Sequence, residues 1–367
     1  MIKNKFKTFI VTGGTGGHIF PALNFSDFLN SKGVNNLIIT DYRGSKYIDK
    51  NKYNYKIIPS SHLNKKNIKF ILGIILLFFG FIYYLMLFIQ KRPKYIVTFG
   101  SYTSFMPILC SYIFRRLIKN KIFFHEQNSV IGRVHNLFSF SAEKIFLTFK
   151  ETSQIKNKFF KKTIHSGLPM YKNLYNFRKT NLKVPSKNEK FKFLVFGGSQ
   201  GSSNLAKITV NLLLKLSKDY QKLIYLTIQA PDKDFEIIKN ELDDSYIQYE
   251  IKSYYNDLLN RISRANLCIC RSGSSTINEL INLKCPSILV PLPTAIANHQ
   301  FYNAKFLSDN EAAILIQEKD LLKKETLNKL EKYILNPVSL RKMFDNLGNI
   351  EELDSNEIMY NNIYNEK

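Results

Sequence analysis

The sequence predicts an α/β protein made of two similar domains in tandem, each built on a parallel β-sheet. Short apolar runs alternate with amphipathic segments along all 367 residues, which is typical of parallel sheets covered by helices. A chain of this length also exceeds what one hydrophobic core usually supports. The second half opens as the first does, with an apolar strand, a glycine-rich turn and a helix. Two such domains are expected to bind their ligand in a cleft between the carboxyl ends of the two sheets.

The predicted strands are short runs rich in β-branched and aromatic residues. In the first half we expect strands in FKTFIV, NLIIT, YIVTF, KIFFH and KIFLT. In the second half we expect them in FKFLVF, LIYLTI, YIQYEI, LCIC, SILV and AAILI. The polar stretch 171–190, rich in Lys and Asn, separates the two sets and is the linker candidate.

The composition fits a folded protein with substantial cores. Hydrophobic residues make up 45% of the chain and aromatic residues 14%, which argues against disorder. The net charge of +24 has two explanations that the sequence leaves open: an anionic partner, or a general richness in Lys, Asn and Ile. No long basic block and no RNA-binding aromatic motif is present in the sequence, so we expect no nucleic-acid partner.

The cysteines indicate a reducing compartment. Cys110, Cys268, Cys270 and Cys285 form neither a CxxC pair nor a zinc-binding spacing. Cys268 and Cys270 alternate within LCIC, which predicts one face of a buried strand. Reduced thiols in the cytosol fit this pattern best, and the first residues lack the layout of a signal peptide.

A glycine-rich turn, VTGGTGGH, follows the first predicted strand. Glycines there let a ligand approach the backbone, and the helix expected to start near Pro21 would direct its free N–H groups at that ligand. Tight packing of helix on strand explains such a turn equally well. His18 at the mouth of the turn is a candidate general base, with a helix-capping or solvated histidine as the alternative. Asp41, after the second strand, is the nearest candidate for a dinucleotide ribose ligand, but the spacing of the glycines is not GxGxxG.

A polar cluster, His125 to Asn128 (HEQN), directly follows the predicted strand KIFF. Polar residues at the carboxyl end of a parallel strand usually line a site. A metal site is disfavoured because no further ligand falls at the required spacing. A cluster that merely caps the next helix remains the other possibility.

The stretch LCICRSGSSTINEL carries the clearest signal for a bound nucleotide. Its strand ends in Arg271, Ser272 and Gly273, and a helix rich in small hydroxyls begins at Ser274. Such a helix N-terminus is suited to a pyrophosphate. Glu279, one turn into the helix, is placed to accept hydrogen bonds from the vicinal hydroxyls of a ribose.

A loop further on, PLPTAIANHQFYNA, contains Gln300, whose amide suits sugar hydroxyls because it both donates and accepts. The only DxD sequence, Asp232 to Asp234, adjoins no strand pattern and is expected at the surface. We therefore expect no metal-diphosphate clamp and no cofactor.

In combination, GGTGGHIFPAL, HEQN, GGSQG, CRSG with Glu279, and HQFYNA occur in the order found in one family. The chain resembles the MurG family of bacterial glycosyltransferases over nearly its whole length. The resemblance implies the GT-B fold, with two Rossmann-like domains facing across a cleft. It implies an N-terminal acceptor and membrane-facing domain over 1–165, a C-terminal UDP-GlcNAc-binding domain over 166–344, and a helix at about 345–367 that packs back on the first domain.

The activity implied by the resemblance is an inverting, metal-independent transfer of GlcNAc from UDP-GlcNAc to lipid I, which gives lipid II for peptidoglycan synthesis and so supports cell shape and division. The implied partners are UDP-GlcNAc, lipid I and the anionic cytoplasmic face of the bacterial inner membrane, where the protein is expected as a peripheral enzyme. By position, the expected catalytic residues are His18 and Glu126. The expected substrate-binding residues are Thr15, Gly16 and Gly17 at the cleft, Asn128 and Gln300 on the GlcNAc, Ser199 on the diphosphate, Glu279 on the ribose, Tyr255 on the uracil through its backbone, and Arg271, Ser272 and Gly273.

The sequence departs from the family pattern at two positions. Tyr171 stands where the family has an arginine ligand, and Ala297 stands where an aspartate is frequent. Diphosphate charge would then rest on helix N-termini and on Arg271 or nearby lysines. The alternatives are a GT-B glycolipid synthase with another lipid acceptor, an enzyme like UDP-GlcNAc 2-epimerase, and a nucleotide-binding scaffold without activity.

The segment FILGIILLFFGFIYYLMLFI, at 70–89, is uncharged and long enough to span a bilayer. A single span would separate His18 from Asn128, Ser199 and Glu279, which one cleft requires. We therefore expect a helix that is buried on one side and dips its outer face into the cytoplasmic leaflet. The flanking lysines, Lys65, Lys66, Lys69, Lys91 and Lys94, would hold it against anionic lipid.

Overall fold

The structure, a computed structural model, describes residues 6–61, 68–186, 188–198 and 201–365. The chain forms two compact units. Unit 1 comprises the chain up to Tyr171 together with the segment from Leu353 onward, and unit 2 comprises Lys172–Glu352.

Unit 1 is built on a parallel sheet with the strand order β3-β2-β1-β4-β5-β6-β7. Its central strands are buried on both faces, which explains why they are continuous apolar runs without alternation. Phe9 and Val11 of β1 face one core, and Ile10 between them faces the other. The strands are β1 Thr8–Val11, β2 Asn36–Thr40, β3 Tyr55–Ile57, β4 Tyr95–Thr98, β5 Lys121–Glu126, β6 Lys144–Leu147 and β7 Thr163–His165.

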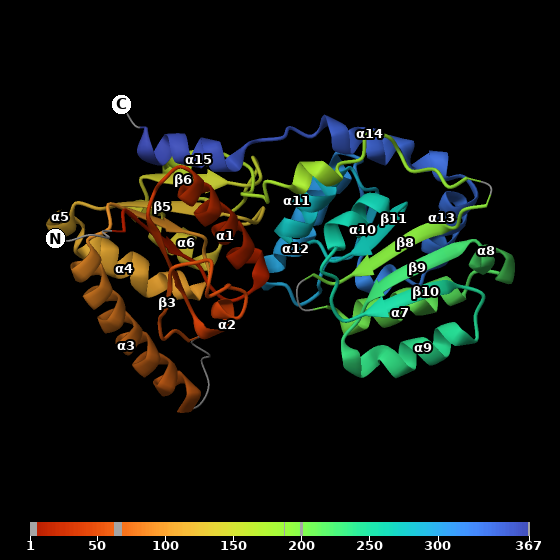
Figure 1. Cartoon of the computed structure of the whole chain (residues 1–367), viewed down its shortest axis with the longest axis horizontal. Coiled ribbons are helices and arrows are strands. Elements are labelled where there is room, and N and C mark those ends of the chain that lie inside the picture. The colour runs from red at the N-terminus through yellow and green to blue at the C-terminus, as the bar shows by residue number, and fades with distance from the viewer. Residues whose placement is uncertain (1–5, 62–67, 187, 199–200, 366–367) are drawn as a thin grey trace. The chain divides into compact units, whose positions relative to one another are not determined.

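Helices cover both faces of this sheet (Figure 1). Helices α1 and α15 pack on the face of Ile10, and α3 and α4 pack on the face of Phe9. The helices of unit 1 are α1 Gly16–Ser31, α2 Tyr42–Ser45, α3 Ile68–Lys91, α4 Phe105–Ile113, α5 Arg115–Ile118, α6 Arg133–Phe138 and α15 Ser355–Tyr364, with 3₁₀ turns η1 Tyr102–Ser104, η2 Ser139–Ser141 and η3 Asn157–Lys162.

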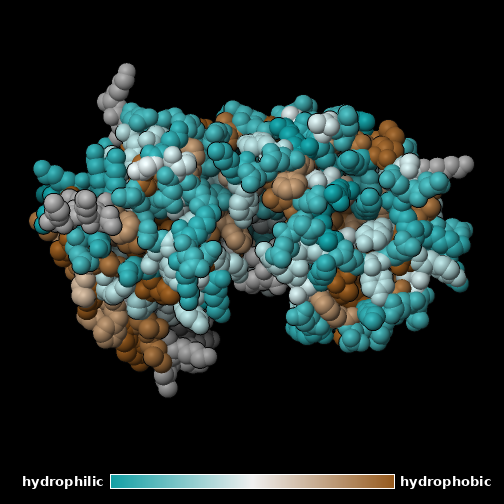
Figure 2. All heavy atoms as spheres, in the orientation of Figure 1, coloured by the Kyte–Doolittle hydropathy of each residue, from teal (hydrophilic) through white to brown (hydrophobic). Residues whose placement is uncertain are grey.

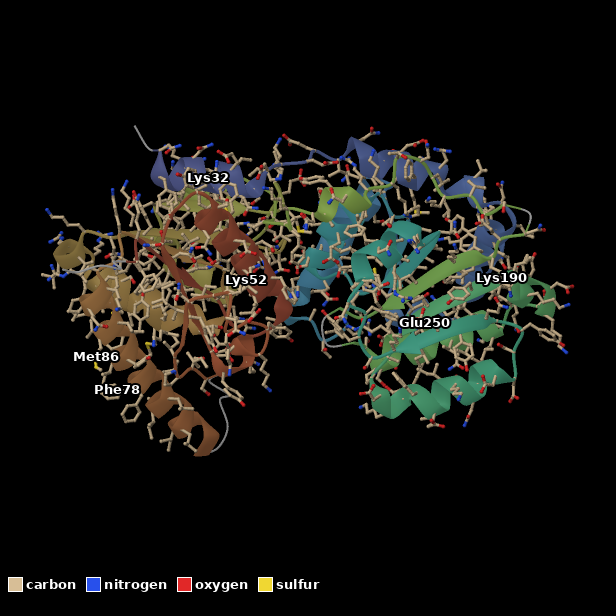
Figure 3. The ribbon with its side chains drawn as sticks, viewed as in Figure 1. Lys32, Lys52, Phe78, Met86, Lys190 and Glu250 are labelled. Carbon is tan, nitrogen blue, oxygen red and sulfur yellow. The ribbon has the colours of Figure 1, made fainter. Side chains whose placement is uncertain are left out.

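Helix α15 fastens the end of the chain to unit 1. Lys32, at the end of α1, lies 3.1 Å from the carboxylate of Glu357 (Figure 3). The ring of Tyr364 stands edge-on to Tyr95 with centroids 4.8 Å apart, and its hydroxyl hydrogen-bonds Thr8. These contacts combine an apolar interface with a polar rim.

Unit 2 repeats the plan with a parallel sheet of order β10-β9-β8-β11-β12-β13, and a large cluster of buried apolar residues, including Phe193 and Val195 of its strand β8, packs on one face of the sheet. Its strands are β8 Phe191–Phe196, β9 Ile224–Gln229, β10 Gln248–Lys252, β11 Leu267–Cys270, β12 Ser287–Leu289 and β13 Ile314–Leu315. Its helices are α7 Ser203–Leu214, α8 Lys218–Lys222, α9 Phe235–Asp243, α10 Leu258–Arg264, α11 Ser274–Leu283, α12 His299–Asp309, α13 Lys324–Leu335 and α14 Arg341–Asn349, with 3₁₀ turns η4 Leu174–Phe177, η5 Asp232–Asp234, η6 Ile296–Asn298, η7 Glu318–Asp320 and η8 Pro337–Leu340.

Every predicted strand is present, and among the described residues the strands that were not predicted are β3 and β7, at the edges of the unit 1 sheet. Both are three residues long and neither is buried throughout, so they carry no apolar run. The DxD sequence is not wholly at the surface, because Asp234 is buried and its carboxylate lies 2.7 Å from Nζ of Lys207.

Two predicted segments differ in extent. The stretch 171–190 was expected as a linker, but most of it packs into unit 2, where Leu174 and Leu182 are buried. The terminal helix expected at about 345–367 is two helices, α14 and α15, and only α15 belongs to unit 1.

Helix α3 is the apolar segment expected at the membrane, and the prediction that one of its sides is buried is confirmed. Leu77, Tyr84, Leu87 and Phe88 are buried, and they fall at helical spacing on one face. Among the described residues it is the single helix that is long and apolar enough to cross a bilayer. Its other face exposes Ile71, Leu72, Ile74, Ile75, Leu76, Phe78, Phe79, Ile82, Met86 and Ile89. Figure 2 shows apolar atoms gathered over this helix, and Figure 3 shows Phe78 and Met86 projecting from it.

Candidate active site

Three loops of unit 1 meet around His18 at the carboxyl edge of the sheet. They follow β1, β4 and β5, and β4 lies between the other two strands. Nδ1 of His18 lies 2.8 Å from the carbonyl oxygen of Phe99 and 2.8 Å from Oε1 of Gln127. Gly100 has the left-handed φ of +77° that favours glycine, and it lies beside the ring, because a Cβ there would touch Cε1 of His18 at 3.4 Å. His18 is thus held by residues that follow two other strands.

Helix α1 begins at Gly16, earlier than the start near Pro21 that the sequence suggested. The N–H groups of His18 and Ile19 both donate to the carbonyl of Thr15, which closes the first turn before the proline is reached. His18 therefore stands in the first helical turn, close to the positive end of the helix dipole. Burial lowers the pKa of His18 below its ordinary value, although Glu126 and the hydrogen bonds to Gln127 and Phe99 act in the opposite direction. The ring is consequently uncharged near pH 7 and can accept a proton.

The glycine-rich turn owes its shape to Asp41. One carboxylate oxygen of Asp41 accepts hydrogen bonds from the N–H groups of Gly14, at 2.9 Å, and Gly44, at 2.8 Å. The other accepts one from the hydroxyl of Tyr102, also at 2.9 Å. Asp41 is therefore occupied and cannot bind a ribose. Thr15, at the N-cap of α1, is exposed, and its side chain makes no capping hydrogen bond.

The carboxylate of Glu126 is enclosed by the loop that follows β5. Its side chain is buried, with Oε1 accepting from the N–H of Asn128 at 3.2 Å and Oε2 accepting from the N–H of Gly132 at 2.8 Å and from Nδ1 of His135 at 3.2 Å. Burial alone would raise the pKa of Glu126, but these hydrogen bonds hold it below its ordinary value. These hydrogen bonds show that Glu126 holds the loop after β5 together.

In unit 2, the N-terminus of α11 lies directly after β11, as expected. The hydroxyl of Ser275 in its first turn is buried without a hydrogen-bond partner. Glu279 is partly buried on the same helix, and no hydrogen bond or ion pair joins it to the described residues. Burial raises the pKa of Glu279 to about 8. A hydroxyl and a carboxyl group without partners, beside free helix N–H groups, are the features that a nucleotide can satisfy.

The guanidinium of Arg271 has protein partners in unit 2. Its guanidinium donates to the hydroxyl of Ser202, to the carbonyls of Val290 and Pro291, and to the carboxylate of Glu318. These bonds use all five donors of a buried side chain. Through these hydrogen bonds, Arg271 links the end of the glycine-rich turn of unit 2, at Ser202, to the loop after β12. A sequence cannot reveal this, because an arginine that follows a strand looks the same whether its partner is a ligand or a glutamate.

The remaining expected residues of unit 2 are anchored to one another. The hydroxyl of Ser272 donates to the carbonyl of Gln300 at 2.8 Å, and Oε1 of Gln300 accepts from the N–H of Leu292 at 3.0 Å. Gly273 is the N-cap of α11. The side chain of Tyr255 is buried, and its hydroxyl donates to the carbonyl of Glu250 at 3.1 Å. Ser199 lies outside the described residues.

The structure thus assembles two sets of residues, one in each unit. Unit 1 gathers Gly16, Gly17 and His18 with the loop of Asn128, and unit 2 gathers Ser272, Gly273 and Gln300 near α11. No role was expected from the sequence for Gln127, His135 or Tyr102. The clearest available signal was His135, a polar residue in the short helix that follows HEQN.

Two family models cover most of the chain. The glycosyltransferase family 28 N-terminal domain matches residues 8–147, and the glycosyltransferase family 28 C-terminal domain matches residues 193–355. The first comprises β1 to β6 with the His18 loops, and the second comprises β8 to β13 with α11.

Several relatives found by sequence share one name. The UDP-N-acetylglucosamine–N-acetylmuramyl-(pentapeptide) pyrophosphoryl-undecaprenol N-acetylglucosamine transferase of Wolbachia sp. subsp. Drosophila simulans is 32% identical, covering 91% of this chain and 92% of the relative. The Rickettsia bellii protein of that name is 31% identical, covering 93% of this chain and 94% of the relative. The crystal structure of Acinetobacter baumannii MurG superposes with a TM-score of 0.75 at 22% identity, covering 98% of this chain and 100% of that one, which confirms the GT-B fold class. The chain therefore belongs to glycosyltransferase family 28 and, within it, to the MurG family of N-acetylglucosamine transferases.

Proposed function

We propose that this protein transfers GlcNAc from UDP-GlcNAc to lipid I, the undecaprenyl-pyrophosphoryl-MurNAc-pentapeptide, to give lipid II with inversion at the anomeric carbon. One observation carries the proposal. Relatives named for this transfer are 31–32% identical over more than nine-tenths of both chains. The chemistry of the two sets of site residues supports it.

The donor is assigned to unit 2. The N-terminus of α11 supplies N–H groups and a positive dipole for the diphosphate, with the unpartnered hydroxyl of Ser275 beside them. Glu279 accepts hydrogen bonds from the ribose hydroxyls. The backbone at Tyr255 hydrogen-bonds the edge of the uracil, and Gln300 contacts the GlcNAc. Because Arg271 is fully occupied and Tyr171 replaces the family arginine, helix N-termini carry most of the diphosphate recognition. Ser199 is also assigned to the diphosphate, on the basis of the sequence alone.

The acceptor is assigned to unit 1. His18 takes the proton of the attacking hydroxyl, because it is the neutral, partly buried histidine at the mouth of the glycine-rich turn. Thr15, Gly16 and Gly17 present an exposed hydroxyl and helix N–H groups to the acceptor, and Asn128 orients the sugar. Glu126 acts by holding the loop of Asn128 in place.

Because the acceptor is linked to a lipid, the enzyme has to bind a membrane surface, and α3 of unit 1 provides the apolar face that does so. Its exposed apolar face enters the outer part of the cytoplasmic leaflet, so that the protein is peripheral to the inner membrane. Lys91, at the end of α3, and Lys94 face the anionic headgroups. Lys65 and Lys66 lie outside the described residues, and nothing is described for the side chain of Lys69.

The proposal is tested by incubating the purified chain with labelled UDP-GlcNAc and a lipid I analogue. We expect a disaccharide-containing lipid, formed equally well in the presence of EDTA. Transfer to diacylglycerol in place of lipid I would identify a glycolipid synthase. Conversion of UDP-GlcNAc into its 2-epimer without an acceptor would identify an epimerase.

A further inference from the structure

A chain of hydrogen bonds with a defined direction runs through unit 1 from the backbone of Gly167 to the ring of His18. Its intermediate members are His125 and Gln127, both buried. The donor and the acceptor of each hydrogen bond can be assigned, because the backbone carbonyl groups at the two ends of the chain can only accept.

The first fixed group is the carbonyl oxygen of Gly167, which can only accept. Nε2 of His125 lies 3.0 Å from it and must therefore carry a proton. Burial lowers the pKa of His125 to about 4, so the ring is neutral at pH 7 and Nδ1 is left unprotonated. Nδ1 of His125 is then an acceptor.

Gln127 is oriented by this acceptor. Its amide nitrogen lies 3.2 Å from Nδ1 of His125 and 2.7 Å from the carbonyl oxygen of the same residue. Both partners accept, so the two amide protons are used and the opposite orientation would place an oxygen against two acceptors. Oε1 of Gln127 consequently faces His18, 2.8 Å from Nδ1.

The second fixed group confirms the direction independently. The carbonyl oxygen of Phe99 also lies 2.8 Å from Nδ1 of His18 and can only accept. Two acceptors converge on one ring nitrogen, so Nδ1 carries the proton and shares it between them. In the neutral ring Nε2 then holds the lone pair.

We propose that Gln127, oriented by His125, is a positioning residue that acts together with the carbonyl of Phe99 to hold His18 in the Nδ1-protonated tautomer and so makes Nε2 the atom that takes the proton of the acceptor hydroxyl. This inference rests on the proposed function of His18 as general base. In the step itself, the hydroxyl oxygen bonds to the anomeric carbon, the bond from that carbon to the UDP oxygen breaks, and the hydroxyl proton moves to Nε2. The two acceptors at Nδ1 stabilise the resulting imidazolium.

Other charged groups also act on His18, and their effects have to be separated from that of Gln127. Glu126, at the end of β5, raises its pKa, and His135, from α6, lowers it. The N-terminus of α1 acts in the same direction as His135. None of these is hydrogen-bonded to the ring, whereas Gln127 and the backbone carbonyl of Phe99 are, so a change at Gln127 removes one of the two acceptors at Nδ1.

The tautomer can be measured without substrate. In protein labelled with ¹⁵N-histidine, the two ring nitrogens of His18, assigned by their loss in His18→Gln, report separately whether each carries a proton. At pH 8 we expect Nδ1 to be protonated and Nε2 to be free. A protonated Nε2 would overturn the inference.

The kinetic test uses opposite changes at one position. Gln127→Met removes one acceptor and should lower kcat about tenfold, the worth of one hydrogen bond, with KM nearly unchanged. It should also shift the acid limb of the kcat profile to lower pH, whereas Gln127→Glu should shift it to higher pH. Tyr84→Phe, which removes a buried hydrogen bond to Ser111 elsewhere in unit 1, is the matched control and should leave the limb in place.

The outcomes separate the two claims. If both Gln127 variants leave the acid limb of the kcat profile in place, Gln127 has no positioning role, even in an active transferase. If the spectra show the expected tautomer but no GlcNAc is transferred, the proposed function fails while the hydrogen-bond assignment stands. Should Gln127→Met not fold, the wild-type spectrum and Gln127→Glu still decide the matter.

Discussion

The carboxylate of Glu126 and the ring of His135 form a buried pair in unit 1, with Oε2 3.2 Å from Nδ1. The other ring nitrogen of His135 lies 2.8 Å from the hydroxyl of Thr98, so the pair joins the end of β4 to the end of β5. Gly100 lies against both this ring and that of His18, since a Cβ at its position would lie 3.4 Å from Cε1 of each. The loops around His18 therefore rest on a buried ionisable pair.

We expect Glu126→Gln to destabilise the fold. Both carboxylate oxygens of Glu126 now accept hydrogen bonds. In glutamine one of them becomes an NH₂ group, which would face another donor, and this costs about 1–3 kcal/mol in the free energy of unfolding. Urea denaturation measures this, and Glu357→Gln, at an exposed ion pair with Lys32, is the control expected to change little. A variant as stable as the wild type but inactive would show that Glu126 acts on the substrate directly.

His18→Ala should remove a general base. We expect kcat to fall by about 10²–10⁴ with a small change in KM, because the loss affects the transition state and not the bound substrate. Steady-state kinetics with a soluble lipid I analogue measures both constants. A rise in KM at unchanged kcat would make His18 a substrate-positioning group.

Glu279 should make donor binding depend on pH. Its pKa of about 8 lies above the ordinary 4.5, so near pH 7 it is largely protonated in the free protein. If its carboxylate accepts the ribose hydroxyls, affinity for UDP-GlcNAc should rise as pH increases toward 8 and should be accompanied by proton release. Calorimetry in buffers of different ionisation enthalpy measures both. Glu279→Ala should weaken binding by about 1–3 kcal/mol and abolish the pH dependence.

The same group predicts how stability changes with pH. Because the folded state of Glu279 binds its proton more tightly than the unfolded state, its contribution to stability is complete below about pH 4.5 and is lost as pH rises to about 8. The difference in unfolding free energy between Glu279→Gln and the wild type should therefore grow in favour of the variant across this range. A difference independent of pH would mean that Glu279 titrates normally.

The exposed face of α3 should control membrane binding. Phe78 and Met86 are each 58% exposed, so the double change to glutamate should leave the fold intact and reduce co-sedimentation with vesicles that contain anionic lipid. Leu335 and Val338 of unit 2, 64% and 54% exposed, provide the matched double change to glutamate. Equal loss of binding in both variants would indicate nonspecific adsorption.

The sequence was sufficient for the central part of the fold because buried parallel strands are continuous apolar runs. The runs at β1 and β8, each followed by glycines, located both units. It could not reveal β3, whose three residues are incompletely buried, or the early start of α1, which depends on backbone bonds to Thr15.

For the site, the sequence identified residue types and not their partners. The sequence predicted that Glu126 and Arg271 contact the substrate. In the structure, Glu126 bonds to His135, in a segment that folds back on it, and Arg271 bonds to Glu318, which is far away in the sequence. Gln127 lies beside His18 only because β5 and β1 are brought to the same sheet edge. Such pairings arise from tertiary packing, which local patterns do not encode.

The most direct test of the central claim is the anomeric configuration of the product. UDP-GlcNAc carries an α-linked sugar, so an inverting transfer to lipid I predicts one new β-linked GlcNAc for each UDP released, visible by proton NMR of the reaction with a soluble acceptor analogue. An α-linked product, or UDP released without any glycoside, would contradict the account.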